Sequence, residues 1–188
     1  MLQKISFFVY LSLVALAPAA TLTFNLDPNA GQGVIDPLAY GANHFDVSDA
    51  TLRRVGGNRM TGYNWELNAS NAGNDYLDQS DYYLLGQVGL PQNGSQAPAA
   101  VPAQYVTQFR AQGSQAEIVT LQAGGYVSAD AAGPVSAGET APSTRWKQVL
   151  PIKPGWPGSW TLNPVTTDAY VYMDEQVNYL KNQFGPAS

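Results

Sequence analysis

The segment Arg53–Glu66 concentrates side chains that can bind a sugar. It holds three arginines, a pair of glycines at positions 56 and 57, and an Asn-Trp pair at positions 64 and 65. Only 12% of the chain is charged, so this cluster of arginines indicates a specific role. Guanidinium and amide groups hydrogen-bond hydroxyls, and an aromatic ring can stack on the apolar face of a sugar. The competing interpretation is structural: arginine–carboxylate pairs hold the loop, and the tryptophan belongs to the core.

The residues before this segment predict a strand that carries it to the end of a sheet. Leu52–Val55 is typical of a short buried strand. The glycine pair that follows lets the backbone turn sharply or approach another group closely. The polar and aromatic residues are therefore expected on a loop at the end of that strand.

Downstream, the sequence predicts a helix and then a strand. Pro102–Ala111 has proline in its first turn, and Gly113 suits the end of the helix. Ala116–Gln122 is typical of a short buried strand. Helix followed by strand is the βα rhythm of a parallel sheet. The helix residues expected to share one face are Val101, Tyr105, Val106 and Phe109.

Other segments have weaker patterns. Thr21–Leu26 alternates polar and apolar residues, which predicts a half-exposed strand. Gly73–Pro98 is polar and is expected to form a long surface loop, and Ala123–Val165 is expected to be an irregular insertion. The insertion contains Trp146, Trp156 and Trp160, which are either sugar platforms or, more often in such segments, a small internal core.

A final helix is expected near the C-terminus, with Thr167 or Asp168 as its cap and Gly185-Pro186 at its end. Its apolar residues recur at steps of three and four, which predicts one buried face. The residues of that predicted face are Tyr170, Met173, Val177, Leu180 and Phe184.

Composition excludes several classes of protein. A hydrophobic content of 45% in 188 residues is enough for a folded core and excludes a disordered tail. The net charge of −5 argues against nucleic acid as a partner, because phosphate binding needs a basic surface. One histidine and no cysteine exclude a multi-histidine metal site and disulfides, and no cofactor is expected.

Residues 1–20 have the pattern of a secretory signal peptide. Lys4 supplies the positive start, Ile5–Leu16 is apolar, and Ala17-Pro18-Ala19 has the small residues of a cleavage site. A retained membrane anchor is the alternative, but the apolar run is shorter than the about 20 residues that a spanning helix needs. We therefore expect a secreted, extracellular protein without membrane attachment after cleavage.

Three motifs, in the same order along the chain, resemble glycoside hydrolase family 44, which comprises endo-β-1,4-glucanases and xyloglucanases. The first is Tyr40-Gly41-Ala42-Asn43. The second is Arg54–Trp65 with the Asn-rich residues 68–75 behind it, and the third is Val171–Leu180. The run that ends in Asn64-Trp65 is the most specific of these.

The resemblance implies a partial (β/α)8 TIM barrel, with an N-terminal strand that belongs to an accessory β-sandwich. Residues 21–188 would be the N-terminal part of a truncated catalytic domain, covering about three βα units. The family uses a retaining mechanism with two glutamates, one in an Asn-Glu-Pro motif, and this chain has no such motif. No residue of the chain is therefore named as catalytic or as a metal ligand, and the isolated chain is expected to be inactive and poorly soluble.

By resemblance, six residues are expected to bind a β-glucan substrate: Asn43, Asn58, Arg59, Tyr63, Asn64 and Trp65. Arg59 and Asn64 would bond hydroxyls, Trp65 would stack on a sugar, and Arg54 would point into the barrel beside a carboxylate. The full-length enzyme is expected to be a monomer. The alternative function is a secreted, non-catalytic carbohydrate-binding protein, and a cell-surface structural protein is a weaker third.

Overall fold

The computed structural model describes residues 22–43 and 49–185. The chain divides into two compact units, Met1–Val34 and Ile35–Ser188. The predicted signal peptide lies outside the described residues. Residues 22–34 are exposed and contain a turn at 28–31 but no strand, so the strand predicted at Thr21–Leu26 is not found in its described part.

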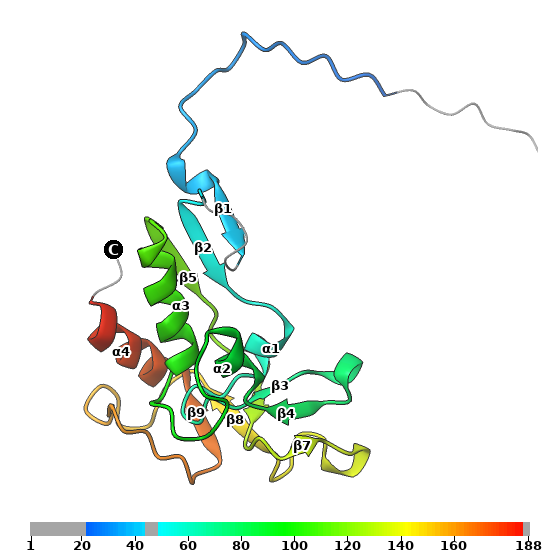
Figure 1. The fold of residues 1–188 in the computed structure, drawn as a ribbon, viewed down its shortest axis with the longest axis vertical. Helices are drawn as coiled ribbons and strands as arrows, with labels where there is room; N and C mark the ends of the chain where they lie inside the picture. The colour runs from blue at the N-terminus through cyan, green and yellow to red at the C-terminus, as the bar shows by residue number, and fades with distance from the viewer. Residues whose placement is uncertain (1–21, 44–48, 186–188) are drawn as a thin grey trace, which may run out of the picture. The chain divides into compact units, whose positions relative to one another are not determined.

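A parallel sheet forms the first part of the larger unit. Its strand order is β1 (Gly41–Asn43), β2 (Leu52–Val55) and β5 (Ala116–Val119). Helix α3 (Ala100–Ala111) immediately precedes β5 and packs against both β2 and β5, as Figure 1 shows. The apolar face predicted for this helix is confirmed, since all four of its predicted residues are buried.

Two more small sheets lie mostly in segments that were predicted to be irregular, and one strand of the second sheet lies where the last helix was predicted to begin. One is antiparallel, with the order β3 (Ser70–Asn71), β4 (Gln79–Asp81) and β7 (Gly133–Pro134). The other has the order β6 (Tyr126–Ser128), β8 (Trp146–Leu150) and β9 (Tyr170–Tyr172), and its β8–β9 pair is parallel. Each strand has five residues or fewer, which is too short to leave a period in the sequence.

The predicted α/β class is confirmed, but the described residues form three small open sheets and no closed barrel. Two short helices complete this part of the chain, α1 (Asn58–Thr61) after β2 and α2 (Tyr83–Gln87) before α3. No helix in the described part of the chain is both long enough and apolar enough to cross a membrane.

Helix α4 (Met173–Phe184) differs from its prediction at both its start and its buried face. Its N-cap is Tyr172 rather than Thr167 or Asp168, because the residues just before it pair as β9. Its buried residues are Glu175, Gln176 and Tyr179. The predicted apolar face is instead only partly covered, and Val177 is among the exposed large hydrophobic residues.

One hydrophobic core joins the segments of the larger unit. It includes aromatic residues from the loop after β2, from α3 and from α4, together with valines of β6, β8 and β9. The aromatic members are Tyr63, Trp65, Tyr105, Phe109 and Tyr179. The rings of Trp65 and Tyr179 lie 5.6 Å apart, which ties the loop after β2 to α4.

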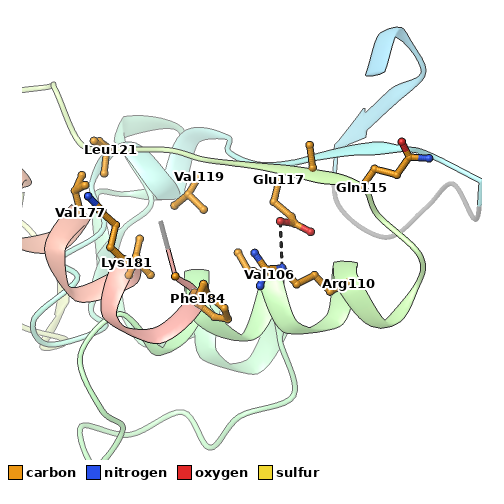
Figure 2. Close-up of a pocket in the computed structure, with 12 residues that line it drawn as sticks. Val106, Arg110, Gln115, Glu117, Val119, Leu121, Val177, Lys181 and Phe184 are labelled. Atoms are coloured by element: carbon orange, nitrogen blue, oxygen red, sulfur yellow. Dashed lines mark hydrogen bonds and ion pairs between the residues drawn. The ribbon is translucent and has the colours of Figure 1, made fainter. Parts of the chain in front are cut away.

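A groove of about 350 Å³ lies between α3, β5 and α4. Figure 2 shows Val119, Leu121 and Val177 on its walls, with the ion pair of Arg110 and Glu117 at one side. Among the described strands, β5 pairs only with β2, so its other edge is open. The groove is lined by both apolar and charged side chains. An open strand edge beside it favours association with another chain.

An Ile118→Lys substitution is expected to raise the monomeric fraction of the chain. Ile118 lies on β5 with 48% of its surface exposed, and a lysine on an open edge opposes strand pairing. Thr107→Lys on the exposed side of α3 is the matched control. Sedimentation velocity over a range of protein concentrations measures the effect. A parent chain that stays monomeric at all concentrations would show that this edge does not drive association.

Candidate functional site

The loop after β2 forms a pocket at the carboxyl end of that strand. Gly57 has a φ of 110°, which a residue with a side chain adopts only with strain, and α1 begins directly after it. Asn58 and Arg59 line a cavity of about 390 Å³ together with Tyr76 and Tyr83. We call this cavity the Arg59 pocket.

Arg59 organises this pocket. Its guanidinium is paired with the carboxylate of Asp81 through both terminal nitrogens. The same guanidinium lies 4.6 Å from the centre of the Tyr83 ring. The pairing with Asp81 agrees with the structural interpretation, in which arginine–carboxylate pairs hold the loop. The contact with Tyr83 fixes that aromatic ring at the wall of the pocket.

The tyrosines of the Arg59 pocket are available to a ligand. Tyr76 is 68% exposed and Tyr83 is 47% exposed, so each can offer a ring face. The side-chain amide of Asn58 donates to the carbonyl of Ala72, which leaves its oxygen free to accept a hydrogen bond. Neither Tyr76 nor Tyr83 was predicted from the sequence, although aromatic residues inside a polar loop were the available signal.

The structure places Trp65 in the core, with an exposed fraction of 0%. A ring without exposed surface cannot stack on a sugar, so the predicted stacking role of Trp65 is wrong for this arrangement. The physical reason is its contact with Tyr179, which comes from a helix more than a hundred residues later in the chain. Trp65 is therefore a core residue, which agrees with the structural interpretation of the segment Arg53–Glu66.

Tyr63 and Asn64 are also fully buried, and internal partners hold both. The Tyr63 hydroxyl donates to the side-chain oxygen of Asn68 at 2.6 Å, and burial raises the pKa of Tyr63. The Asn64 amide donates to the carbonyl of Ser128 at 2.8 Å. These contacts fix the path of the loop and leave neither side chain for direct contact with a polymer.

Asn43 is exposed at the end of β1, in register with Arg54 of β2. Arg54 is also exposed and has no carboxylate partner within the described residues, so its predicted pairing is not found. Its neighbour Arg53 is the buried arginine, 5.7 Å from the centre of the Phe109 ring. Substrate binding by Asn43, Asn58 and Arg59 stays a prediction.

A buried ion pair holds the end of the loop after β2. The Lys147 ammonium donates to Glu66 at 2.7 Å and to Asp168 at 3.2 Å, and the carbonyls of Val165 and Tyr170 each accept at 3.4 Å. Burial raises the pKa of the Glu66 carboxyl to about 7, although Lys147 acts to lower it. The cluster connects the loop after β2 with β8 and with the segment before β9.

All four glutamates of the chain are held in ion pairs. Glu66 and Glu175 are buried against Lys147 and Lys153, and Glu117 pairs with Arg110. Glu139 is exposed but caps its own turn, and hydrogen bonds from Ser136 lower its pKa. A pair of glutamates that could act together on a bound polymer is therefore not formed by the described residues.

Trp156 and Trp160 contact each other in the insertion, but Trp156 is 56% exposed and Trp160 is only half-buried, so the pair is not the buried internal core that was favoured. Their rings lie 5.9 Å apart at 68°, and the Trp160 indole N–H donates to Asp174 at 3.1 Å. Trp146 is different, since it lines a second cavity. In the described part of the chain, no three acidic or histidine side chains are grouped to hold a metal ion.

A parallel sheet with polar and aromatic loops at its carboxyl ends defines an α/β protein, a class in which ligands bind at that face. The sequence pattern of glycoside hydrolase family 44 matches residues 69–188. Endoglucanase A of Paenibacillus lautus is 44% identical over 175 residues, which is 92% of this chain and 24% of that protein. The chain therefore belongs to glycoside hydrolase family 44 and spans about a quarter of that relative.

Solved structures of the same family share this fold. The family 44 endoglucanase of Clostridium thermocellum has a TM-score of 0.74 and 49% identity, over 81% of this chain and 29% of its own. The family 44 xyloglucanase of Paenibacillus polymyxa, solved with xyloglucan, has a TM-score of 0.73 and 44% identity. That match covers 80% of this chain and 29% of the xyloglucanase. The family resemblance seen in the sequence is confirmed.

Proposed function

We propose that this chain forms part of the substrate-binding surface of a secreted hydrolase that cleaves β-1,4-glucans of the cellulose or xyloglucan type. The observation that carries the proposal is membership of family 44, together with a relative solved with xyloglucan. The Arg59 pocket supports it, because exposed tyrosine faces and an amide oxygen suit a neutral sugar.

The reaction in this proposal is the retaining one. A nucleophilic carboxylate attacks the anomeric carbon while a second carboxyl protonates the leaving oxygen, and the two groups lie about 5–5.5 Å apart. Water then hydrolyses the glycosyl-enzyme intermediate. Because residues 1–188 lack the Asn-Glu-Pro motif that the family resemblance implies, we propose that both catalytic glutamates lie in a part of the enzyme outside these residues.

The 188-residue chain is expected to bind xyloglucan without cleaving it. Native electrophoresis in gels that contain xyloglucan measures binding, and a reducing-sugar assay measures cleavage. Tyr83→Ala is expected to weaken binding about tenfold through loss of an aromatic face. Tyr40→Ala is the matched control, since Tyr40 is exposed and does not line the pocket.

Release of reducing ends by the chain would contradict the placement of the catalytic glutamates. Migration unaffected by xyloglucan would contradict the binding role itself. Equal weakening by Tyr83→Ala and Tyr40→Ala would move the binding surface away from the Arg59 pocket.

We also infer that the protein is exported, on the strength of the signal pattern at residues 1–20. The expected mature N-terminus follows Ala19 or Ala20. N-terminal sequencing of protein recovered from culture medium tests this, and an intact Met1 on the cell-associated protein would contradict it.

A further inference from the structure

A second cavity, of about 210 Å³, shares Asn58 with the Arg59 pocket. We call it the Trp146 pocket. It lies between the residues that follow β2 and those that follow β5, on the face where parallel sheets bind ligands. Its walls include Asn58, Thr61, Asn71, Asp78, Tyr126 and Trp146.

Two aromatic residues that line this cavity, Tyr126 and Trp146, lie on one face of the β6–β8 strand pair. Trp146 of β8 is in register with Ser128 of β6, and Tyr126 lies two residues earlier on β6. Side chains two residues apart on a strand share a face, so Tyr126 and Trp146 lie on the same side of the pair. The alternate residues, Val127 and Lys147, are buried on the other side.

The Trp146 ring is fixed before any ligand binds. Its indole N–H donates to the carbonyl of Glu139 at 3.0 Å. The ring is half-buried, and it remains at the wall of the cavity. A ring held in this way loses little conformational entropy when a sugar stacks on it.

Three polar groups at the Trp146 pocket have no hydrogen-bond partner among the described residues. Within the described residues, neither the Asp78 carboxylate nor the Tyr126 hydroxyl has a hydrogen-bond partner, and the side-chain oxygen of Asn58 is also free. Carboxylate and amide oxygens accept hydrogen bonds from hydroxyls, and the tyrosine hydroxyl can also donate one. No described lining residue is cationic, which disfavours a uronic acid or a phosphate.

We propose that the Trp146 pocket is a second sugar subsite, which takes one neutral pyranose ring of the polymer that the Arg59 pocket binds. The cavity is smaller than the about 300 Å³ at which pockets for drug-sized ligands begin, so it suits a single ring rather than a length of chain. Because Asn58 lines both cavities, one polymer can occupy them together. This inference rests on the proposed function.

Calorimetric titration of the 188-residue chain with cellotetraose and with cellobiose tests the proposal. The parent chain is expected to bind cellotetraose more tightly, because only the longer sugar reaches both pockets. Asp78→Gly removes the free carboxylate and suits the positive φ of 47° at this position, so it is expected to keep the fold. Asp78→Gly and Trp146→Phe are each expected to weaken cellotetraose binding about fivefold or more and to leave cellobiose binding unchanged.

Trp156→Ala is the matched control, because Trp156 is 56% exposed and lines neither pocket. Unchanged cellotetraose binding in both Asp78→Gly and Trp146→Phe, with weaker binding in Tyr83→Ala, would overturn the second subsite alone. Failure of the parent chain to bind any glucan would overturn the proposed function as well.

Discussion

A Lys147→Met variant is expected to lose about 3–5 kcal/mol of unfolding free energy, because it leaves a buried carboxylate without its partner. Lys147 and Glu66 are both almost fully buried, and their charged atoms are 2.7 Å apart. Urea denaturation followed by tryptophan fluorescence measures the loss. The double variant Glu66→Gln with Lys147→Met is expected to recover part of it, since the unpaired charge is then gone.

Arg110→Met is the matched control for this prediction. Arg110 also pairs with a glutamate, but about half of its side chain is exposed, so its removal is expected to cost no more than about 1 kcal/mol. Equal losses of unfolding free energy in Lys147→Met and Arg110→Met would contradict the claim that the buried pair stabilises the fold more than the exposed one.

The effect of Lys147→Met is expected to depend on pH. Burial raises the pKa of Glu66 from an ordinary value of 4.5 to about 7. A carboxyl with a raised pKa contributes stability that is fully present below its unfolded value and is lost as pH rises through its folded value. Removal of Lys147 raises that pKa further. The variant should therefore lose more unfolding free energy, relative to the parent, at about pH 8 than at about pH 5. A pH-independent loss would contradict this account of the cluster.

A Trp65→Ala variant is expected to lose about 3–5 kcal/mol of unfolding free energy through the cavity it creates. Trp65 is fully buried and contacts Tyr179, so its loss weakens the link between the loop after β2 and α4. Trp156→Ala is the control and is expected to change stability by about 0.5 kcal/mol or less, as an exposed residue. Denaturation in urea measures both.

The outcome for Trp65→Ala also separates its two interpretations. Core packing predicts a loss of stability, and a sugar platform predicts a stable protein with weaker binding. A Trp65→Ala protein that unfolds like the parent but is no longer retarded by xyloglucan would restore the sugar-binding role.

The elements predicted best from sequence are those whose pattern is local. Helix α3 was found because its apolar residues recur at helical spacing. Strands β2 and β5 were found as short segments near glycine, although two of the four residues of β2 are arginines and no residue of β5 is fully buried. Strands β4, β6 and β8 were missed because they are short and lie among glycine and polar residues. The start of α4 was placed early because the apolar residues of β9 extend its period backwards.

The site was predicted in part, because burial depends on contacts that sequence spacing does not reveal. Arg59 and Asn58 were assigned to a ligand site and do line a pocket. Trp65 and Asn64 were assigned to the same surface but are covered by α4 and β6, far away in the sequence. Asp81 and Tyr83 became part of the site only because β4 and α2 place them beside Arg59.

The most direct test of the account is an NMR titration of the 188-residue chain with cellotetraose. The account predicts chemical-shift changes at the backbone amides of Gly56–Thr61 and of Gly124–Tyr126, which border the two pockets. The amides of Val177–Phe184, along the groove beside α4, are expected to stay unchanged. Shifts confined to α4, or no shifts at millimolar sugar, would contradict the claim that the loop after β2 is the glucan-binding part of this chain.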